Sequence, residues 1–169
     1  MRYYFYNANS HNNFIDDCFP RAYSIVMDIT WKEAYKELCK SAMEQGQMMD
    51  NAVFVRNFLD KKFKRIPYIE TYIGEFAENH PIGKYLITTN NHITACVNGY
   101  VIDTWDCTNK KIEYIWKVWY NLYEQVCDDY LSIENCMSIH IQGDKGHNLS
   151  FFVCYDIIRL GDKYENCYW

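Results

Sequence analysis

The chain has 169 residues, of which 49 % are apolar and 23 % charged, a composition typical of one globular domain and not of a disordered chain. Its net charge of −5 argues against a nucleic-acid polymer as partner, because a phosphate backbone selects a basic surface. The longest apolar runs fall far short of the roughly 20 residues that a membrane span needs, and the N-terminal segment lacks the apolar core of a secretory signal. We therefore expect a protein of the cytoplasm with no membrane partner.

Eight cysteines are spread along the chain, and their pattern favours free thiols in a reducing compartment. Most of them lie on apolar stretches, where a thiol behaves as a small hydrophobic group. There is no Cys-x-x-Cys pair and no histidine at ligand spacing from two cysteines, so we expect no structural zinc site and no cofactor. Four disulfides in a secreted protein are the alternative that the even number leaves open.

The first half of the chain is predicted to be mainly helical. Residues 1–17 are interpreted as an extended segment followed by a loop. Helices are then predicted over residues 18–28, 31–43, 50–64 and 71–80. The clearest is the second, because Thr30-Trp31-Lys32-Glu33 has the pattern of a capping box and apolar residues follow it at helical spacing.

The second half changes to the pattern of strands. These are predicted over residues 84–89, 92–97, 100–105, 136–142 and 149–158. Asn98-Gly99 between two of them predicts a hairpin with a type I′ turn, whereas residues 112–128 stay ambiguous between helix and strand. Helices followed by antiparallel strands predict an α+β fold with the helices packed on one side of an antiparallel sheet.

Cys18 is the candidate nucleophile. It follows Asp16 and Asp17 at the point where the first predicted helix begins. A thiol at a helix N-terminus is favoured as the thiolate, and the unpaired backbone N–H groups there can hold an oxyanion. The alternative is a buried cysteine beside a loop.

The predicted hairpin supplies a partner for this thiol. If Asn98-Gly99 is a two-residue turn, Thr94 pairs with Asp103, and His92 lies diagonally beside Asp103 on the same face. Asp106 falls on the opposite face and is the weaker candidate. An imidazole oriented by a carboxylate is what a cysteine nucleophile needs. A histidine at a strand end with no catalytic role is the alternative.

Three stretches of the chain resemble the papain-like cysteine peptidase superfamily, and in particular its small members from bacteriophages and bacteria. They cover roughly residues 3–107. In order they are the segment from Tyr6-Asn7-Ala8-Asn9 to Asp17-Cys18-Phe19-Pro20-Arg21-Ala22, the helix that begins Trp31-Lys32-Glu33-Ala34-Tyr35, and Ile73-Gly74-Glu75-Phe76-Ala77-Glu78-Asn79-His80-Pro81 followed by residues 92–106. The resemblance implies one papain-like domain over 1–169, in which 108–169 is an extension.

The resemblance also implies roles for individual residues. Cys18 would be the nucleophile, His92 the base that becomes the general acid, and Asp103 the group that orients His92. An amide side chain a few residues before the cysteine helps to hold the oxyanion in the superfamily, and this implies Asn12, with Asn13 as the near alternative.

Two functions follow from this sequence. The first is a cysteine hydrolase of peptidase or amidase type, with a peptide or amide substrate and a thioester intermediate. The second is a non-catalytic protein on the same fold that captures a host protein or a nucleotide-type signalling molecule. For the second, the 18 % of aromatic residues would stack on the ligand, and the basic run Lys61-Lys62-Phe63-Lys64-Arg65, otherwise a solvated helix end, would contact its phosphates.

Overall fold

The computed structural model describes residues 2–119, 136–142 and 148–154. The chain divides into two compact units, Met1–Trp119 and Tyr120–Trp169. In the second unit β7 (Cys136–Gln142) pairs antiparallel with β8 (Asn148–Cys154), as the strand pattern predicts, and the predicted strand residues 155–158 lie outside the described residues. Whether residues 108–169 form one domain with the rest of the chain stays a prediction.

The described part of the first unit contains four helices and six strands. In chain order they are β1 (Tyr3–Phe5), α1 (Cys18–Met27), α2 (Trp31–Glu44), α3 (Ala52–Lys62), β2 (Lys64–Arg65), α4 (Ile73–Asn79), β3 (Lys84–Thr89), β4 (His92–Val97), β5 (Tyr100–Asp103) and β6 (Tyr114–Val118). The expected α+β class is confirmed. Among the described residues, no helix has the length and apolar character needed to cross a membrane.

The six strands form one sheet in the order β1-β5-β4-β3-β6-β2. Its centre is antiparallel, since β3 pairs with both β4 and β6, and β4 pairs with β5. The N-terminal strand β1, however, runs parallel to β5 at the edge. The sheet is therefore mixed and not antiparallel throughout as expected, because the chain passes through all four helices between β1 and β5 and no local pattern sets the direction of that pairing.

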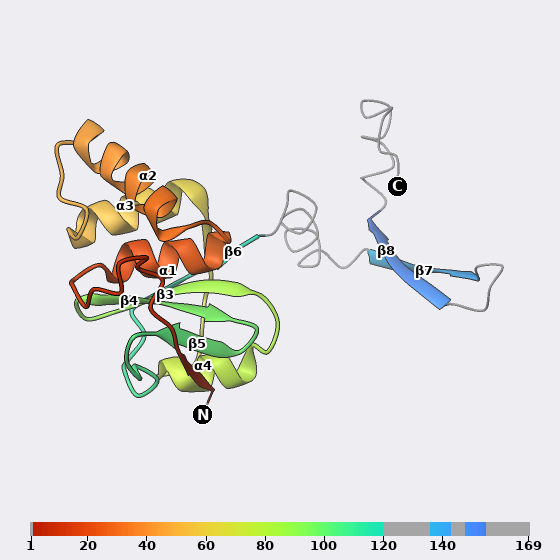
Figure 1. Ribbon diagram of the computed structural model, residues 1–169. Coiled ribbons are helices and arrows are strands. Elements are labelled where there is room, and N and C mark those ends of the chain that lie inside the picture. The colour runs from red at the N-terminus through yellow and green to blue at the C-terminus, as the bar shows by residue number, and fades with distance from the viewer. Residues whose placement is uncertain (1, 120–135, 143–147, 155–169) are drawn as a thin grey trace. The chain divides into compact units, whose positions relative to one another are not determined.

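Helices cover both faces of the sheet (Figure 1). Side chains alternate along β3, so that Leu86 packs under α1, α2 and α3 while Tyr85 and Ile87 pack against α4. The same alternation places Trp116 of β6 in the first core and Ile115 in the second. The expectation of helices on one side only was wrong, because α4 buries Ile73 and Phe76 against the opposite face.

Local sequence signals set the boundaries of several elements. The capping box of α2 is present: Thr30 Oγ1 accepts from the Glu33 N–H at 3.2 Å, and Glu33 Oε2 accepts from the Thr30 N–H at 2.9 Å. Asn98 and Gly99 have φ angles of 49° and 77°, and Val97 pairs with Tyr100, which confirms the type I′ hairpin. Residues 114–118 of the ambiguous segment form β6, because β3 offers them a partner strand.

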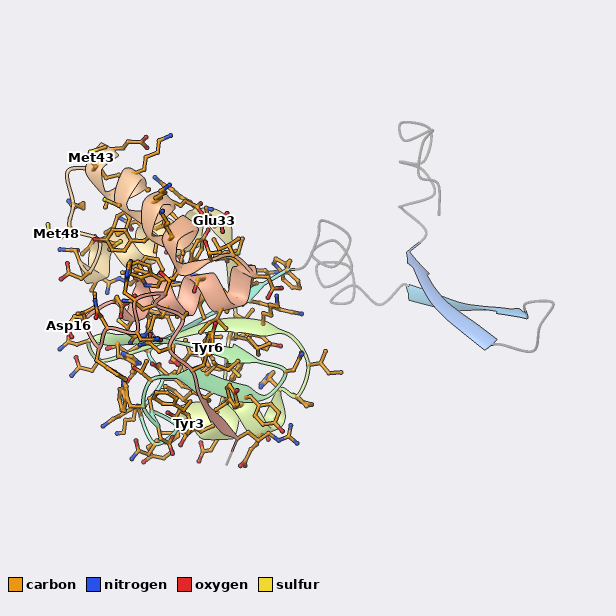
Figure 2. All side chains as sticks on the ribbon, viewed as in Figure 1. Tyr3, Tyr6, Asp16, Glu33, Met43 and Met48 are labelled. Atoms are coloured by element: carbon orange, nitrogen blue, oxygen red, sulfur yellow. The ribbon has the colours of Figure 1, made fainter. Side chains whose placement is uncertain are left out.

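Stability should depend on the buried face of α2. Leu38 is fully buried, whereas Met43 on the same helix is 73 % exposed at its outer end (Figure 2). We expect Leu38→Ala to lower the free energy of unfolding by about 2–5 kcal/mol through lost burial and the cavity left behind, and Met43→Ala to change it by no more than about 0.5 kcal/mol. Urea unfolding of both variants measures the difference, and equal losses would contradict this core.

Candidate active site

Cys18 is the first residue of α1 and is partly exposed as a free thiol. The helix begins here because the Arg21 N–H donates to the Asp17 carbonyl at 3.1 Å. In the part of the chain that the structure describes, no side chain caps this first turn, since the Asp17 carboxylate makes no capping hydrogen bond. The thiol therefore lies at the positive end of the helix dipole, where an anion is favoured.

His92 and Asp103 are in direct contact, as the hairpin register predicts. His92 begins β4 and Asp103 ends β5, and His92 Nε2 lies 2.8 Å from Asp103 Oδ2. With Nε2 held by Asp103, the other ring nitrogen, Nδ1, is the one left for Cys18. The indole of Trp105 covers the imidazole at a centroid distance of 4.9 Å.

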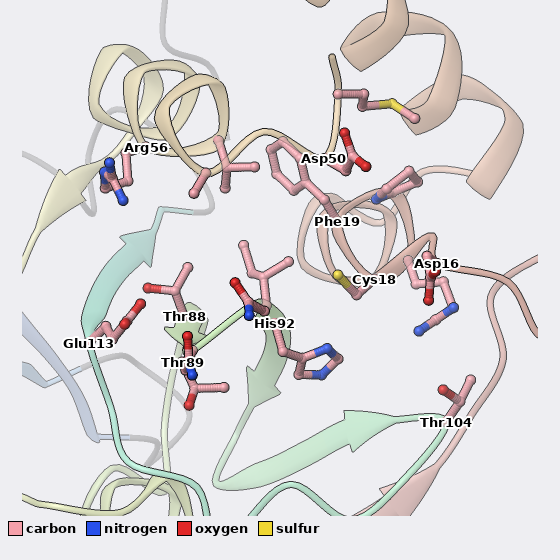
Figure 3. Close-up of a pocket in the computed structure, with 18 of the residues that line it drawn as sticks. Asp16, Cys18, Phe19, Asp50, Arg56, Thr88, Thr89, His92, Thr104 and Glu113 are labelled. Carbon is pink, nitrogen blue, oxygen red and sulfur yellow. The ribbon is translucent and has the colours of Figure 1, made fainter. Parts of the chain in front are cut away.

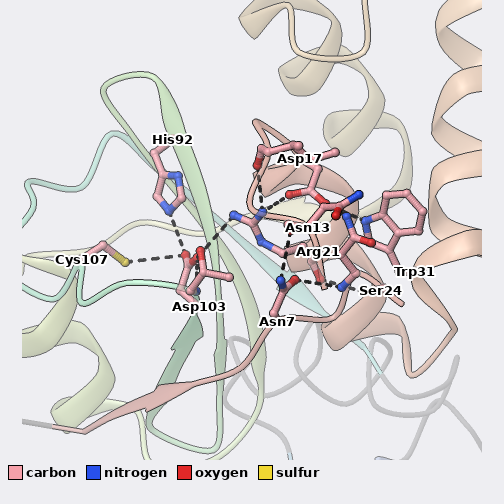
Figure 4. A network of polar contacts seen from close by, with 12 residues as sticks. Asn7, Asn13, Asp17, Arg21, Ser24, Trp31, His92, Asp103 and Cys107 are labelled. Carbon is pink, nitrogen blue, oxygen red and sulfur yellow. Dashed lines mark hydrogen bonds and ion pairs between the residues drawn. The ribbon is translucent and has the colours of Figure 1, made fainter. Parts of the chain in front are cut away.

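Asp103 is the centre of a wider polar network (Figure 4). Its Oδ1 accepts from the Thr104 N–H at 2.7 Å and lies 3.8 Å from the Arg21 guanidinium. Its Oδ2, besides contacting His92, accepts a long hydrogen bond of 3.9 Å from the Cys107 thiol. Asp103 is only 5 % exposed, so these contacts replace the water that an ionised carboxylate otherwise requires.

A second buried carboxylate, Asp17, joins the network through Arg21. The Arg21 guanidinium pairs with Asp17 Oδ1, and both side chains are more than nine-tenths buried. Asp17 Oδ2 accepts from Asn9 Nδ2 at 2.9 Å and from the Trp31 indole at 3.0 Å. Arg21 therefore lies between two carboxylates, and it connects the start of α1 to the end of β5.

The pKa values describe an ion pair between His92 and Asp103. Burial lowers the pKa of His92, but hydrogen bonding by Asp103, Cys107 and Cys18 outweighs it and raises the pKa to about 11. Burial raises the pKa of Asp103, but the His92 imidazolium outweighs it, so the pKa lies below its ordinary value. At neutral pH His92 is therefore the cation and Asp103 the anion.

Cys18 and His92 line one cavity of about 750 Å³, facing it from α1 and β4 (Figure 3). Exposed carboxylates of Asp16, Asp50 and Glu113 also line it, together with Arg56. Arg21 belongs to the lining as well, but its charge is engaged by Asp17 and Asp103. His92 lines the cavity as a cation too, and its charge is balanced by its ion pair with Asp103. The charges left for a ligand are therefore those of the three carboxylates and Arg56, with an excess of negative charge.

The structure does not bring Asn12 to this cavity. Neither Asn12 nor Asn13 is among the described residues that line it. Asn12 lines a separate cavity of about 700 Å³ beside Tyr6 and Trp31. It has a left-handed φ of 55°, and its N–H donates to the Asn9 carbonyl at 2.8 Å, so it closes a turn in the loop before α1.

The basic run of residues 61–65 is engaged with carboxylates. Lys62 pairs with Glu37 and donates to the Tyr23 hydroxyl at 2.7 Å. Arg65 binds Asp60 through two nitrogens, at 2.6 Å and 3.0 Å. None of the five residues of this run lines the cavity of Cys18 among the described residues. This arrangement favours the interpretation as a solvated helix end.

The sequence pattern missed the parts played by Arg21 and Cys107. Arg21 lies three residues after Cys18, which places it nearly one helical turn along α1, but the pattern does not show that it points to β5. Cys107 follows β5 by four residues, and only the course of the loop after Asp103 returns its thiol to the carboxylate.

Comparison with known proteins finds no matching family model, no matching curated protein and no matching solved structure. The site is therefore interpreted from its own geometry.

Removal of Arg21 should be costly. In Arg21→Met the buried carboxylates of Asp17 and Asp103 lose their shared cation, and we expect the free energy of unfolding to fall by about 3–5 kcal/mol. The control is Lys40→Met, because Lys40 pairs with Glu44 at 4.0 Å on an open surface, where such a pair contributes about 0–1 kcal/mol. Similar losses in the two variants, measured by urea unfolding, would show that the buried pairing adds no stability.

The proton on His92 should be held by Asp103. We expect NMR to show that the imidazole loses its proton with a pKa of about 11. Asp103→Asn should lower that pKa. Because the folded pKa lies above the ordinary 6.5, this proton stabilises the fold fully below pH 6.5, and the stabilisation is lost as the pH rises toward 11. Asp106→Asn is the control, since Asp106 accepts a hydrogen bond from the Thr108 hydroxyl instead. An equal shift of the His92 pKa in both variants would contradict the pairing of His92 with Asp103.

Proposed function

We propose that this chain is a papain-like cysteine hydrolase of peptidase or amidase type, related to the small bacteriophage and bacterial members of that superfamily. The observation that carries the proposal is that His92, which lies 2.8 Å from Asp103, lines the same cavity as Cys18. The order of Cys18, His92 and Asp103 along the chain, on a helix and then on a sheet, is the order that the superfamily resemblance implies. Neither feature names the substrate.

The chemistry would begin with the thiolate of Cys18 and the imidazolium of His92. The thiolate attacks the carbonyl carbon of an amide, and His92 gives its proton to the leaving nitrogen as the C–N bond breaks. The product is an amine and a thioester on Cys18. Once the thiolate charge is gone, the proton affinity of His92 falls, so the neutral imidazole can take a proton from the attacking water. Hydrolysis then breaks the C–S bond, releases a carboxylic acid and restores the thiolate and the imidazolium.

The surroundings of Cys18 would serve both the intermediate and the substrate. The N–H groups in the first turn of α1 can stabilise the oxyanion, since no capping side chain occupies them. The carboxylates of Asp16, Asp50 and Glu113 in the cavity favour a substrate with a cationic group over a phosphate-bearing ligand. This charge supports the hydrolase over a nucleotide-binding protein.

The function can be tested by the reactivity of Cys18. We expect limiting iodoacetamide at about pH 6 to alkylate Cys18 far faster than the exposed Cys39, because an ordinary thiol with a pKa of about 8.5 is almost fully protonated there. His92→Ala should abolish the difference. Peptide mass spectrometry assigns the modified residues, and an acid quench during turnover of a peptide amide should trap an acyl group on Cys18.

Cys39 is an internal control because it is more exposed than Cys18 and is not among the described residues that line the cavity of His92. If Cys18 reacts no faster than Cys39, the thiolate is absent and the hydrolase is excluded. If Cys18 reacts fast but no amide is cleaved and no acyl group is trapped, the site binds a ligand without turning it over.

A further inference from the structure

We propose that His92, Asp103 and Cys107 form a binding site for a zinc-type divalent cation, on the side of the imidazole away from Cys18. One ligand atom from each residue lies within 4.8 Å of the other two. Cys107 is fully buried and Asp103 is 5 % exposed, so the thiol and the carboxylate are held in place by the core. Nitrogen, oxygen and sulfur ligands together are typical of zinc, and thiolate sulfur excludes magnesium and calcium as preferred ions.

Two of the distances between the ligand atoms are close to those of a tetrahedral centre. Metal–ligand bonds of about 2.0–2.3 Å place neighbouring ligand atoms about 3.4–3.6 Å apart. His92 Nε2 and Asp103 Oδ2 are now 2.8 Å apart, and the Cys107 sulfur is 3.9 Å from the same oxygen. For an ion to bind, the distance between Nε2 and Oδ2 must lengthen by about 0.6 Å and the distance from Oδ2 to the Cys107 sulfur must shorten by about 0.3 Å.

The charges and the surroundings of the site also suit a dication. Binding releases the Nε2 proton of His92 and the thiol proton of Cys107 to solvent, and the thiolate and carboxylate then neutralise the two positive charges. Asp103 Oδ1 is already fixed by the Thr104 N–H at 2.7 Å and lies 3.8 Å from Arg21. A ligand carboxylate whose second oxygen is held in this way is a common feature of protein metal sites.

The metal site and the active site share His92 but not their cysteines. A cation on Nε2 replaces the hydrogen bond by which Asp103 orients the ring, so a loaded site would silence the hydrolase. That consequence rests on the proposed function, whereas metal binding itself does not. Sequence inspection missed the cluster because its ligands come from two strands and a loop, without the paired spacing of a zinc motif.

Titration with Co²⁺ tests the proposal, because a tetrahedral site gives visible ligand-field bands and a thiolate ligand adds a charge-transfer band. We expect Cys107→Ser to remove the charge-transfer band and to weaken Zn²⁺ binding, measured by competition with a chelating dye, by about 100-fold or more, since losing even a supporting partner costs roughly 10–100-fold. Zn²⁺ should raise the melting temperature of the wild-type protein, and this shift should be absent in Cys107→Ser.

Two further variants keep the test decisive. His92→Gln removes a ligand on the cavity wall and leaves the fully buried Cys107 unchanged. This variant should also lose the metal affinity and the rise in melting temperature with Zn²⁺. Cys18→Ser should keep both, whether or not Cys18 proves to be a nucleophile. The proposal is overturned if Cys107→Ser and His92→Gln bind metal as the wild-type protein does, or if Cys18→Ser loses binding while Cys107→Ser retains it.

Discussion

The carboxylate of Asp103 is buried, and most of the site is arranged around that fact. A charged group away from water is stable only when it is paired and hydrogen bonded. Here the pairing partners are His92 at the start of β4 and Arg21 on α1, so one side chain at the end of β5 connects three elements. Arg21 in turn requires Asp17, directly before Cys18. The position of the thiol relative to the imidazole is therefore tied to a single chain of buried charges.

Aromatic packing holds the helix that carries the thiol. Phe19 and Tyr23 of α1 meet Phe54 and Phe58 of α3 edge to face, with ring centroids 5.8–6.4 Å apart for Phe19 and 5.6 Å apart for Tyr23 and Phe58. Such contacts add to the hydrophobic gain of burial. These four aromatic side chains belong to the core of the first unit, and Phe19 among them also lines the cavity of Cys18. The packing fixes α1 against α3, and with it the position of Cys18 at the start of the helix.

The imidazole of His92 joins two kinds of chemistry in one small volume. In the proposed hydrolase its Nδ1 side would serve Cys18, whereas its Nε2 side meets Asp103 and Cys107, which together have the ligand types of a metal centre. A proton and a cation compete for the same Nε2 atom, so the two states exclude each other. The exposed carboxylates line the cavity with Cys18, and none of them belongs to the proposed metal cluster.

Local sequence patterns determined the capped helix that begins at Trp31 and the hairpin at Asn98-Gly99. The register of that hairpin in turn determined the contact between His92 and Asp103. These features depend on residues near each other in the chain, where capping and turn chemistry fix the geometry. Tertiary structure alone decided that β1 pairs in parallel with β5, that Arg21 and Cys107 reach Asp103, and that Asn12 faces another cavity. Each of these depends on how separate segments pack and on which buried charge needs a partner, and no local pattern contains that information.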